Sequence, residues 1–422
     1  MVRGSEGRII AYSARQWLTF VSRGIPPSPV FQRLGAGQNL HGTPSEAAQL
    51  TANPPAQTRQ SLATSRTTSR RPYVDVFRGL LIAHMALDHA SLMFNSGRAP
   101  EELASGAAPV FGDLFQFLTR FLGVPVAPGF FFMAGFMVAL TSDARQQRGR
   151  APADITRQLL IRGLVLIAVD ALIMGLPRAL MGFYSFMTLS SIGVGIIVLA
   201  GVRHLPNRIL APVAIGLLVL HPLLDVSALP VPLQAILYEP VRSGAFRSMY
   251  PVFPWIGIVM LGYVIGRDSL RRPDSRPQWL GLAAISVVIF LAVRLFVGYG
   301  NAYPYTAVAS FAFWTFAKYP PDLPFLAWSF SCIFVALAAL ASIVRHTTPA
   351  RLRPLEIFGR VPFFFFVVHF YVLGIVQALL RTKTGLPGVY LIWMLLLAAM
   401  MGPCIWYDRK KRERGNLITR YF

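Results

Sequence analysis

The chain has 422 residues, of which 54% are hydrophobic and only 14% are charged. A soluble domain carries roughly a quarter charged residues, so this composition excludes an ordinary soluble protein and favours an integral membrane protein. The formal net charge of +22 would suit a nucleic-acid-binding protein. The basic residues, however, lie in short gaps between apolar segments, as in the cytoplasmic loops of membrane proteins, and we predict no nucleic-acid partner.

Residues 1–70 differ in kind from the rest of the chain. They are rich in Ser, Thr, Gln, Pro, Gly and Arg, and Glu6 and Glu46 are their only acids. No apolar segment of signal-peptide length occurs there. We interpret this region as a disordered basic N-terminal tail, with an organellar transit peptide or an upstream start codon as alternatives. A membrane domain follows at 71–408, and a basic cytoplasmic C-terminal tail at 409–422 closes the chain.

The membrane domain is predicted to be an all-α, polytopic transmembrane helical bundle. Apolar segments near twenty residues long fit the ~30 Å of hydrocarbon that a helix must cross. Basic residues are concentrated in alternate gaps together with both tails, which predicts that both termini are cytoplasmic. About ten spans are expected, at 73–94, 122–141, 158–176, 186–202, 207–224, 251–266, 278–298, 322–343, 357–380 and 388–406.

The first predicted span contains an unusual polar stripe. In the stretch DVFRGLLIAHMALDHA, Asp75, Arg78 and His89 fall within about 60° of one another on a helix, whereas His84 and Asp88 point the other way. A charged group at membrane depth costs at least ~2.5 kcal/mol, so these side chains are either paired or used. An ion pair at the helix entry would explain Asp75 and Arg78, and an interhelical hydrogen bond would explain His89.

Further candidates lie late in the chain. Arg360 and His369 are nine residues apart and would face opposite sides of one helix, unless it is broken at Pro362. Lys318, beside a Tyr-Pro-Pro turn, could bind an anionic acceptor or reach the membrane interface as an ordinary lysine. The two cysteines, Cys332 and Cys404, lie in different predicted helices and have no metal-ligand spacing. No metal site is predicted.

Several motifs, in order along the chain, resemble a known family. The quoted motifs are DVFRGL with MALDH (75–89), APGFFFMAGFMVAL (127–140), YPVFPWIGIVMLGYVIGR (250–267), KYPPDLPFLAWSF (318–330) and FGRVPFFFFVVHFYVLGIV (358–376). Over residues 71–422 the chain thereby resembles the transmembrane acyltransferase superfamily, and within it bacterial relatives of heparan-α-glucosaminide N-acetyltransferase. The resemblance implies that His89 is the catalytic histidine and that Arg78 is the matching arginine near the cytoplasmic face.

The resemblance implies an enzyme that moves an acyl group, acetyl in the first instance, from cytosolic acyl-CoA to an extracytoplasmic sugar or other small acceptor. His89, Arg78 and Asp75 are its catalytic candidates. Its substrate-binding and cofactor-binding candidates are Arg360, His369, Lys318 and Asp88. Acyl-CoA is the co-substrate, and no metal is needed. The expected location is the bacterial inner membrane, in contact with the lipid bilayer, and a homodimer is compatible with this reading. The alternatives are a secondary transporter or exporter of a small polar or anionic solute and a non-catalytic membrane scaffold.

Overall fold

The computed structural model of the chain describes residues 71–99, 108–240, 245–296, 298–305, 307–344 and 348–413. All of them belong to one unit, Thr68–Phe422. The predicted N-terminal tail, 1–70, and the last part of the predicted C-terminal tail, 414–422, lie outside the described residues. Residues 409–413 of the C-terminal tail continue the last helix of the membrane domain.

Helices dominate the described residues, in agreement with the predicted class, and many carry proline in the first turn. Proline suits this position because its fixed φ fits a helix and its missing N–H would have no intrahelical partner there. In chain order the α-helices are α3 (Pro72–Phe94), α5 (Leu114–Leu122), α6 (Val126–Gln147), α7 (Pro152–Ala168), α8 (Leu176–Leu180), α9 (Thr188–Val202), α10 (Asn207–Leu220), α11 (Val231–Leu237), α12 (Val252–Leu270), α13 (Arg276–Leu295), α14 (Leu323–Ile343), α15 (Arg353–Arg360), α16 (Pro362–Leu380) and α17 (Leu386–Glu413). The π-helix η2 (Val169–Met174) and the 3₁₀ helices η3 (His221–Leu223), η4 (Phe311–Trp314) and η5 (Ala350–Leu352) lie between them.

Five helical stretches in the described part of the chain are long and apolar enough to cross a membrane. They are Leu114–Gln147, Arg276–Leu295, Leu323–Ile343, Pro362–Leu380 and Leu386–Glu413. Helix α3 is not among them, because its charged residues and histidines lower its mean hydropathy. The five apolar helices fit a multi-pass membrane protein. The number of ten spans and the cytoplasmic position of both termini stay predictions.

Most predicted spans differ from the observed helices by a few residues at their ends, α17 continues to Glu413 beyond the predicted end at 406, and three further spans differ in other ways. The span at 122–141 is helix α6, which begins only at Val126 and continues to Gln147. The span at 158–176 is α-helical to Ala168 and then becomes the π-helix η2. The span at 357–380 is divided at Val361 into α15 and α16. Val361 precedes Pro362, and a residue before proline avoids the helical conformation, which ends α15 there.

A small sheet departs from the all-α prediction. Strand β1 (Tyr184–Phe186) pairs in parallel with β2 (Phe246–Ser248), so that Ser185 lies opposite Arg247. Each strand has only three residues and carries no long alternating pattern, so no sequence pattern predicts the pair. Its effect is to bring two distant loops together beside the start of α9.

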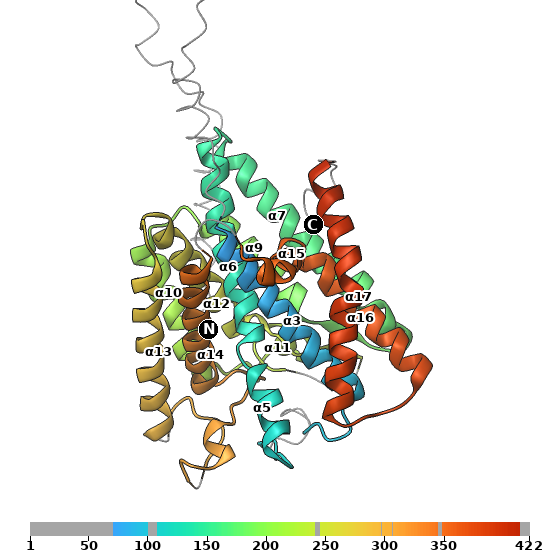
Figure 1. The fold of residues 1–422 in the computed structure, drawn as a ribbon. Coiled ribbons are helices and arrows are strands. Elements are labelled where there is room, and N and C mark those ends of the chain that lie inside the picture. The colour runs from blue at the N-terminus through green and yellow to red at the C-terminus, as the bar shows by residue number, and fades with distance from the viewer. Residues whose placement is uncertain are drawn as a thin grey trace, which may run out of the picture. The chain divides into compact units, whose positions relative to one another are not determined.

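Helix α3 occupies the interior, where it packs against α6, α14, α15, α16 and α17 (Figure 1). Its contact with α15 is unusually close, because two glycines lie at the crossing. A Cβ atom on Gly79 would overlap the carbonyl oxygen of Leu355, and a Cβ atom on Gly359 would overlap that of Asp75. The backbones therefore touch, which fixes the position of the turn that carries Asp75 and Arg78.

Candidate active site

Two histidines from distant parts of the chain face each other between α3 and α16. Nδ1 of His89 lies 2.9 Å from Nε2 of His369, and the rings are nearly parallel, with an interplanar angle of 6°. His369 is completely buried, whereas His89 is half-buried and lines a cavity. The sequence predicted functional roles for both residues but did not predict that they would be in contact.

The hydrogen bonds of this pair determine where its protons lie. Nδ1 of His369 is 2.8 Å from the carbonyl oxygen of Phe365, and a carbonyl only accepts, so this nitrogen carries the hydrogen. An imidazolium in a fully buried apolar position would be costly, so His369 is neutral and its Nε2 accepts. His89 must then donate from Nδ1. Its Nε2 is left with the lone pair that a base or nucleophile needs.

The cavity beside His89 has a volume of about 420 Å³. This lies within the range typical of small-molecule sites. Apolar and aromatic side chains form much of its wall, and a few polar groups converge on it. Its polar and aromatic lining residues are Asp88, His89, Phe130, Asp170, Arg178, Phe183, Thr188, Arg247, Tyr250, Lys318, Tyr319, Phe366 and Phe370.

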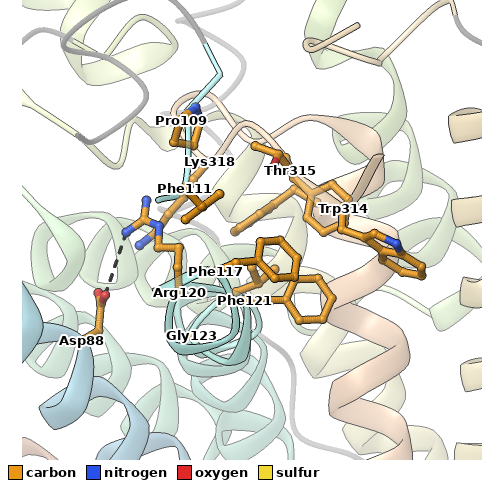
Figure 2. Close-up of a pocket in the computed structure, with 13 residues that line it drawn as sticks. Asp88, Pro109, Phe111, Phe117, Arg120, Phe121, Gly123, Trp314, Thr315 and Lys318 are labelled. Carbon is orange, nitrogen blue, oxygen red and sulfur yellow. Dashed lines mark ion pairs between the residues drawn. The ribbon is translucent and has the colours of Figure 1, made fainter. Parts of the chain in front are cut away.

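Asp88 also lines this cavity, although helical periodicity places it on a different face of α3 from His89. Adjacent residues on a helix differ by only about 100°, and the cavity is broad enough to contact both. One carboxylate oxygen of Asp88 lies 2.9 Å from Nη2 of Arg98 and 3.9 Å from Nη1 of Arg120. Figure 2 shows Arg120 extending from α5 toward Asp88. The carboxylate thus joins the C-terminal end of α3 to two neighbouring segments.

A second, smaller cavity of about 40 Å³ adjoins the first, and the two share Asp88, Gly123 and Lys318. Figure 2 shows Phe117, Phe121 and Trp314 gathered on its other side. The ammonium nitrogen of Lys318 lies 5.0 Å from the ring centre of Tyr319 and 5.7 Å from that of Tyr250. Lys318 therefore faces the cavities and two aromatic rings.

Asp75 and Arg78 form an ion pair at the other end of α3. Nη1 of Arg78 lies 3.3 Å from Oδ1 of Asp75, as the i,i+3 spacing predicted. Asp75 is buried. Arg78 lines a mostly apolar cavity of about 110 Å³, which Arg162 on α7 also lines.

Positive charge accumulates around Arg78. Arg162 lies near enough to Arg78 and Arg145 for their charges to repel one another, and Lys411 is close to both Arg78 and Arg162. Helix α17 has 28 residues and is therefore longer than the ~30 Å of hydrocarbon, since each residue adds ~1.5 Å, and its basic residues lie in the last turn. Burial, followed by the charges of Arg78 and Arg162, lowers the pKa of Lys411 to about 8. Such a cluster would be stabilised by a polyanion.

The cavity of Arg78 and the cavity of His89 are neighbours. They share three lining residues, Phe130, Thr188 and Phe366. The two ends of the polar stripe predicted on α3 therefore lie at two cavities that have these three side chains in their common wall.

Arg360 is placed differently from the other candidates. It forms ion pairs with Glu356 on its own helix and with Asp408 on α17, at 3.4 Å in the latter case, and Asp408 also pairs with Arg412. It lines neither the cavity of His89 nor that of Arg78. The break at Val361 separates Arg360 and His369 into two helices, and the structure does not bring them to one site.

Two cavity residues, Arg178 and Arg247, were not among the predicted site residues. Both are adjacent to the unpredicted sheet, because Arg178 donates from Nη1 to Ser185 Oγ at 2.8 Å and Arg247 pairs with Ser185 across the strands. One feature of the sequence could have identified them as site residues. Both lie in gaps predicted to be extracytoplasmic, where arginine is uncommon.

Comparison with known proteins identifies the family. Residues 70–298, more than half of the chain, match the family described as heparan-alpha-glucosaminide N-acetyltransferase, catalytic. The chain belongs to this family. It is accordingly an acetyltransferase-type enzyme, and the match gives no support to the transporter alternative. A search of curated proteins finds no match.

The family match covers four of the seven predicted site residues. Asp75, Arg78, Asp88 and His89 lie within it. The resemblance inferred from motifs extended to residue 422, whereas the match ends at 298, so Lys318, Arg360 and His369 lie beyond it. The roles of these three residues rest on their geometry in this structure.

Proposed function

We propose that the protein is an integral-membrane acyltransferase that moves an acyl group, most simply acetyl, from cytosolic acyl-CoA to an extracytoplasmic sugar or other small acceptor. The observation that carries this proposal is the His89–His369 pair at the wall of a substrate-sized cavity. Membership of an acetyltransferase family supports the reaction type. The bacterial inner membrane is the proposed location.

His89 is the proposed general base. Its Nε2 takes the proton from the hydroxyl or amine of the acceptor, whose oxygen or nitrogen then attacks the thioester carbonyl carbon. The carbon–sulfur bond breaks, and the leaving thiolate recovers the proton from the imidazolium to give free coenzyme A. Transfer through an acyl-imidazole would use the same lone pair, with the acceptor attacking in a second step. In both routes His369 holds His89 in the reactive tautomer.

Arg78 is the proposed donor-side cation. Coenzyme A carries several phosphate negative charges, and the group formed by Arg78, Arg162 and Lys411 supplies positive charge at the end of α3 opposite to His89. Asp75 orients Arg78 through their ion pair. The long pantetheine arm would then extend past Phe130 and Phe366 to present the thioester at His89.

The test uses the purified full chain in lipid nanodiscs. Acetyl-CoA should raise the thermal unfolding temperature in a concentration-dependent manner, because a ligand that binds only the folded state stabilises it. His89→Ala should retain this stabilisation but lose acceptor-dependent release of coenzyme A. Unchanged release in the His89→Ala variant would refute the role of His89, and a protein that shows no response to acetyl-CoA would contradict acyl-CoA dependence.

A further inference from the structure

Another cavity, of about 490 Å³, lies at the C-terminal end of α6. The last turns of α6 and α12, the first turn of α7 and the residues directly after α9 line it, and we call it the Arg203 cavity. These helix ends adjoin the gaps that are predicted to be cytoplasmic, where arginine is concentrated. Among the described residues, the Arg203 cavity shares no lining residue with the cavities of His89 and Arg78.

Helix α6 separates the Arg203 cavity from that of Arg78. Met133 and Met137 on α6 line the cavity of Arg78, whereas Ala139 and Ser142 line the Arg203 cavity. Because each residue advances about 100° around a helix, these two sets of side chains lie on opposite faces of α6. The Arg203 cavity is therefore not an extension of the space that is proposed to receive acyl-CoA.

Positive charge predominates in the wall of the Arg203 cavity. Asp143 is the one acid among the described residues that line it, and the basic ones are Arg203, His204, Arg267 and Arg271. The three arginines form no ion pair within the described part of the chain. Asp143 instead accepts a hydrogen bond from the side-chain amide of Gln147 at 2.8 Å. The wall therefore has an excess of positive charge that an anion would balance.

Two buried hydrogen-bond donors belong to this wall. Nη2 of Arg203 donates to the carbonyl oxygen of Pro152 at 2.7 Å and to the hydroxyl of Thr156 at 3.1 Å, which orients the guanidinium group. Nε of Arg203 is buried without a hydrogen-bond partner among the described residues, and so is the hydroxyl of Ser142, a side chain that is only 6% exposed. A buried donor without a partner is costly, so both groups indicate a ligand with acceptor oxygens.

Two helices with exposed apolar side chains begin beside the Arg203 cavity. Helix α7, whose first turn lines the cavity, exposes Leu160 and Leu164. Helix α10 begins shortly after Arg203 and exposes Ile209 and Val213. In a membrane protein such side chains contact the acyl chains of lipids. Basic pockets between helices on the cytoplasmic side bind the headgroups of anionic lipids, and the Arg203 cavity has this combination of charge and apolar surroundings.

We propose that the Arg203 cavity binds a phosphate group, supplied either by an anionic phospholipid of the cytoplasmic leaflet or by a soluble phosphate ester. Guanidinium groups suit the oxygens of phosphate, and the hydroxyl of Ser142 supplies a further donor. The exposed faces of α7 and α10 favour the phospholipid. The bound phosphate connects the ends of α6, α7, α9 and α12, because the cavity lies among all four. This binding site is separate from the proposed site of acyl transfer.

The experiment measures the thermal unfolding temperature of the purified full chain in lipid nanodiscs. Nanodiscs of phosphatidylcholine are compared with nanodiscs of equal parts phosphatidylcholine and phosphatidylglycerol. In a third sample, glycerol 1-phosphate is added in solution to phosphatidylcholine nanodiscs, because it presents the same headgroup without acyl chains. Phosphatidylglycerol should raise the unfolding temperature by roughly 2–4 °C, since a ligand that binds only the folded state stabilises it.

The variants test whether the rise comes from the Arg203 cavity. Arg203→Gln and Arg271→Gln should each remove most of it. The side chain of Arg271 forms no hydrogen bond or ion pair within the described part of the chain, so Arg271→Gln should fold even if Arg203→Gln does not. Arg272→Gln is the matched control, because it removes an exposed arginine next to Arg271 that does not line the cavity. It should keep the rise.

The outcomes identify the source of the phosphate or reject the site. A rise with phosphatidylglycerol alone identifies a lipid headgroup, and an equal rise with glycerol 1-phosphate identifies a soluble ester. Either result supports the site if Arg271→Gln removes the rise and Arg272→Gln keeps it. No rise with either probe, a rise that Arg271→Gln retains, or an equal loss in Arg272→Gln overturns it. Loss of stabilisation by acetyl-CoA in Arg271→Gln would assign the cavity to the acyl donor and would also overturn it.

Discussion

Nδ1 of His89 lies within hydrogen-bonding distance of Nε2 of His369, although 280 residues separate them in the chain. In this arrangement one imidazole sets the tautomer of the other, a task that a carboxylate performs in the Ser-His-Asp triad. A neutral partner adds no negative charge beside the thioester. It does, however, fix which nitrogen of His89 carries the lone pair.

Replacing His369 by Phe should therefore lower kcat by roughly 100-fold, with a much smaller change in the KM for acetyl-CoA. An aromatic ring is kept at this position, but the nitrogen that accepts the hydrogen bond from His89 Nδ1 is lost. His89 is then no longer held in one tautomer. His369→Gln should recover part of the loss, because its side-chain oxygen can accept the same hydrogen bond. Steady-state kinetics in nanodiscs measure both values. Equal kcat for His369→Phe and wild type would contradict the positioning role.

Arg78→Gln should raise the KM for acetyl-CoA by roughly 10- to 100-fold, the effect expected on losing a hydrogen bond to a charged phosphate. Arg78→Lys should fall between this variant and wild type, because a lysine keeps the charge but not the paired donors. Arg272→Gln removes an exposed arginine at the end of α12 and serves as the control. A KM for Arg78→Gln that matches the control would argue against phosphate binding at this end of α3.

Lys411 should make acyl-CoA binding depend on pH. Its pKa is lowered to about 8 because burial and neighbouring cations disfavour the charged form. Phosphate binding favours that form, so affinity should be highest below pH 8 and should fall up to about tenfold between pH 7 and 9. Lys411→Arg stays charged across this range and should abolish the dependence. Isothermal titration with acetyl-CoA at both pH values measures it, and an unaltered dependence in the variant would assign the effect to another group.

Arg360→Gln should reduce stability rather than donor affinity. Arg360 links α15 to α17 through Glu356 and Asp408, and its loss leaves two partly buried carboxylates without this partner. The expected cost is about 1–3 kcal/mol of unfolding free energy. Thermal unfolding and the KM for acetyl-CoA should be measured together. A large rise in KM at unchanged stability would restore the binding role that the sequence alone had suggested.

Gly79→Ala should strongly destabilise the protein, because the added methyl group overlaps the backbone of α15 at Leu355. Gly374→Ala, in α16, is the matched control, since a Cβ atom there meets nothing within 4 Å. Alanine is also the better helix former, so the control should be neutral or slightly stabilising. Thermal unfolding in the same detergent compares them. Equal behaviour of the two variants would mean that α3 and α15 can separate at little cost.

Local patterns predicted much of the fold, and contacts between distant segments explain most of what they missed. Each predicted apolar segment contains a helix. The i,i+3 spacing of Asp75 and Arg78 is the spacing at which an ion pair forms on a helix, and the structure contains this pair. Helical periodicity could not predict the His89–His369 contact, because it says nothing about which helices are neighbours. It could not predict that Asp88 and His89 line one cavity either, since the width of a cavity depends on the surrounding helices. Arg178 and Arg247 were missed because a three-residue strand pair leaves almost no pattern in a sequence.

The common wall that Phe130, Thr188 and Phe366 form between the cavities of His89 and Arg78 has a consequence for the membrane as a whole. An enzyme of the proposed kind joins reactants that arrive from opposite compartments, and a continuous aqueous path between them would dissipate ion gradients. Two aromatic rings and one threonine at this boundary would give hydrated ions little to replace their water. The same three side chains would therefore preserve electrical insulation during turnover.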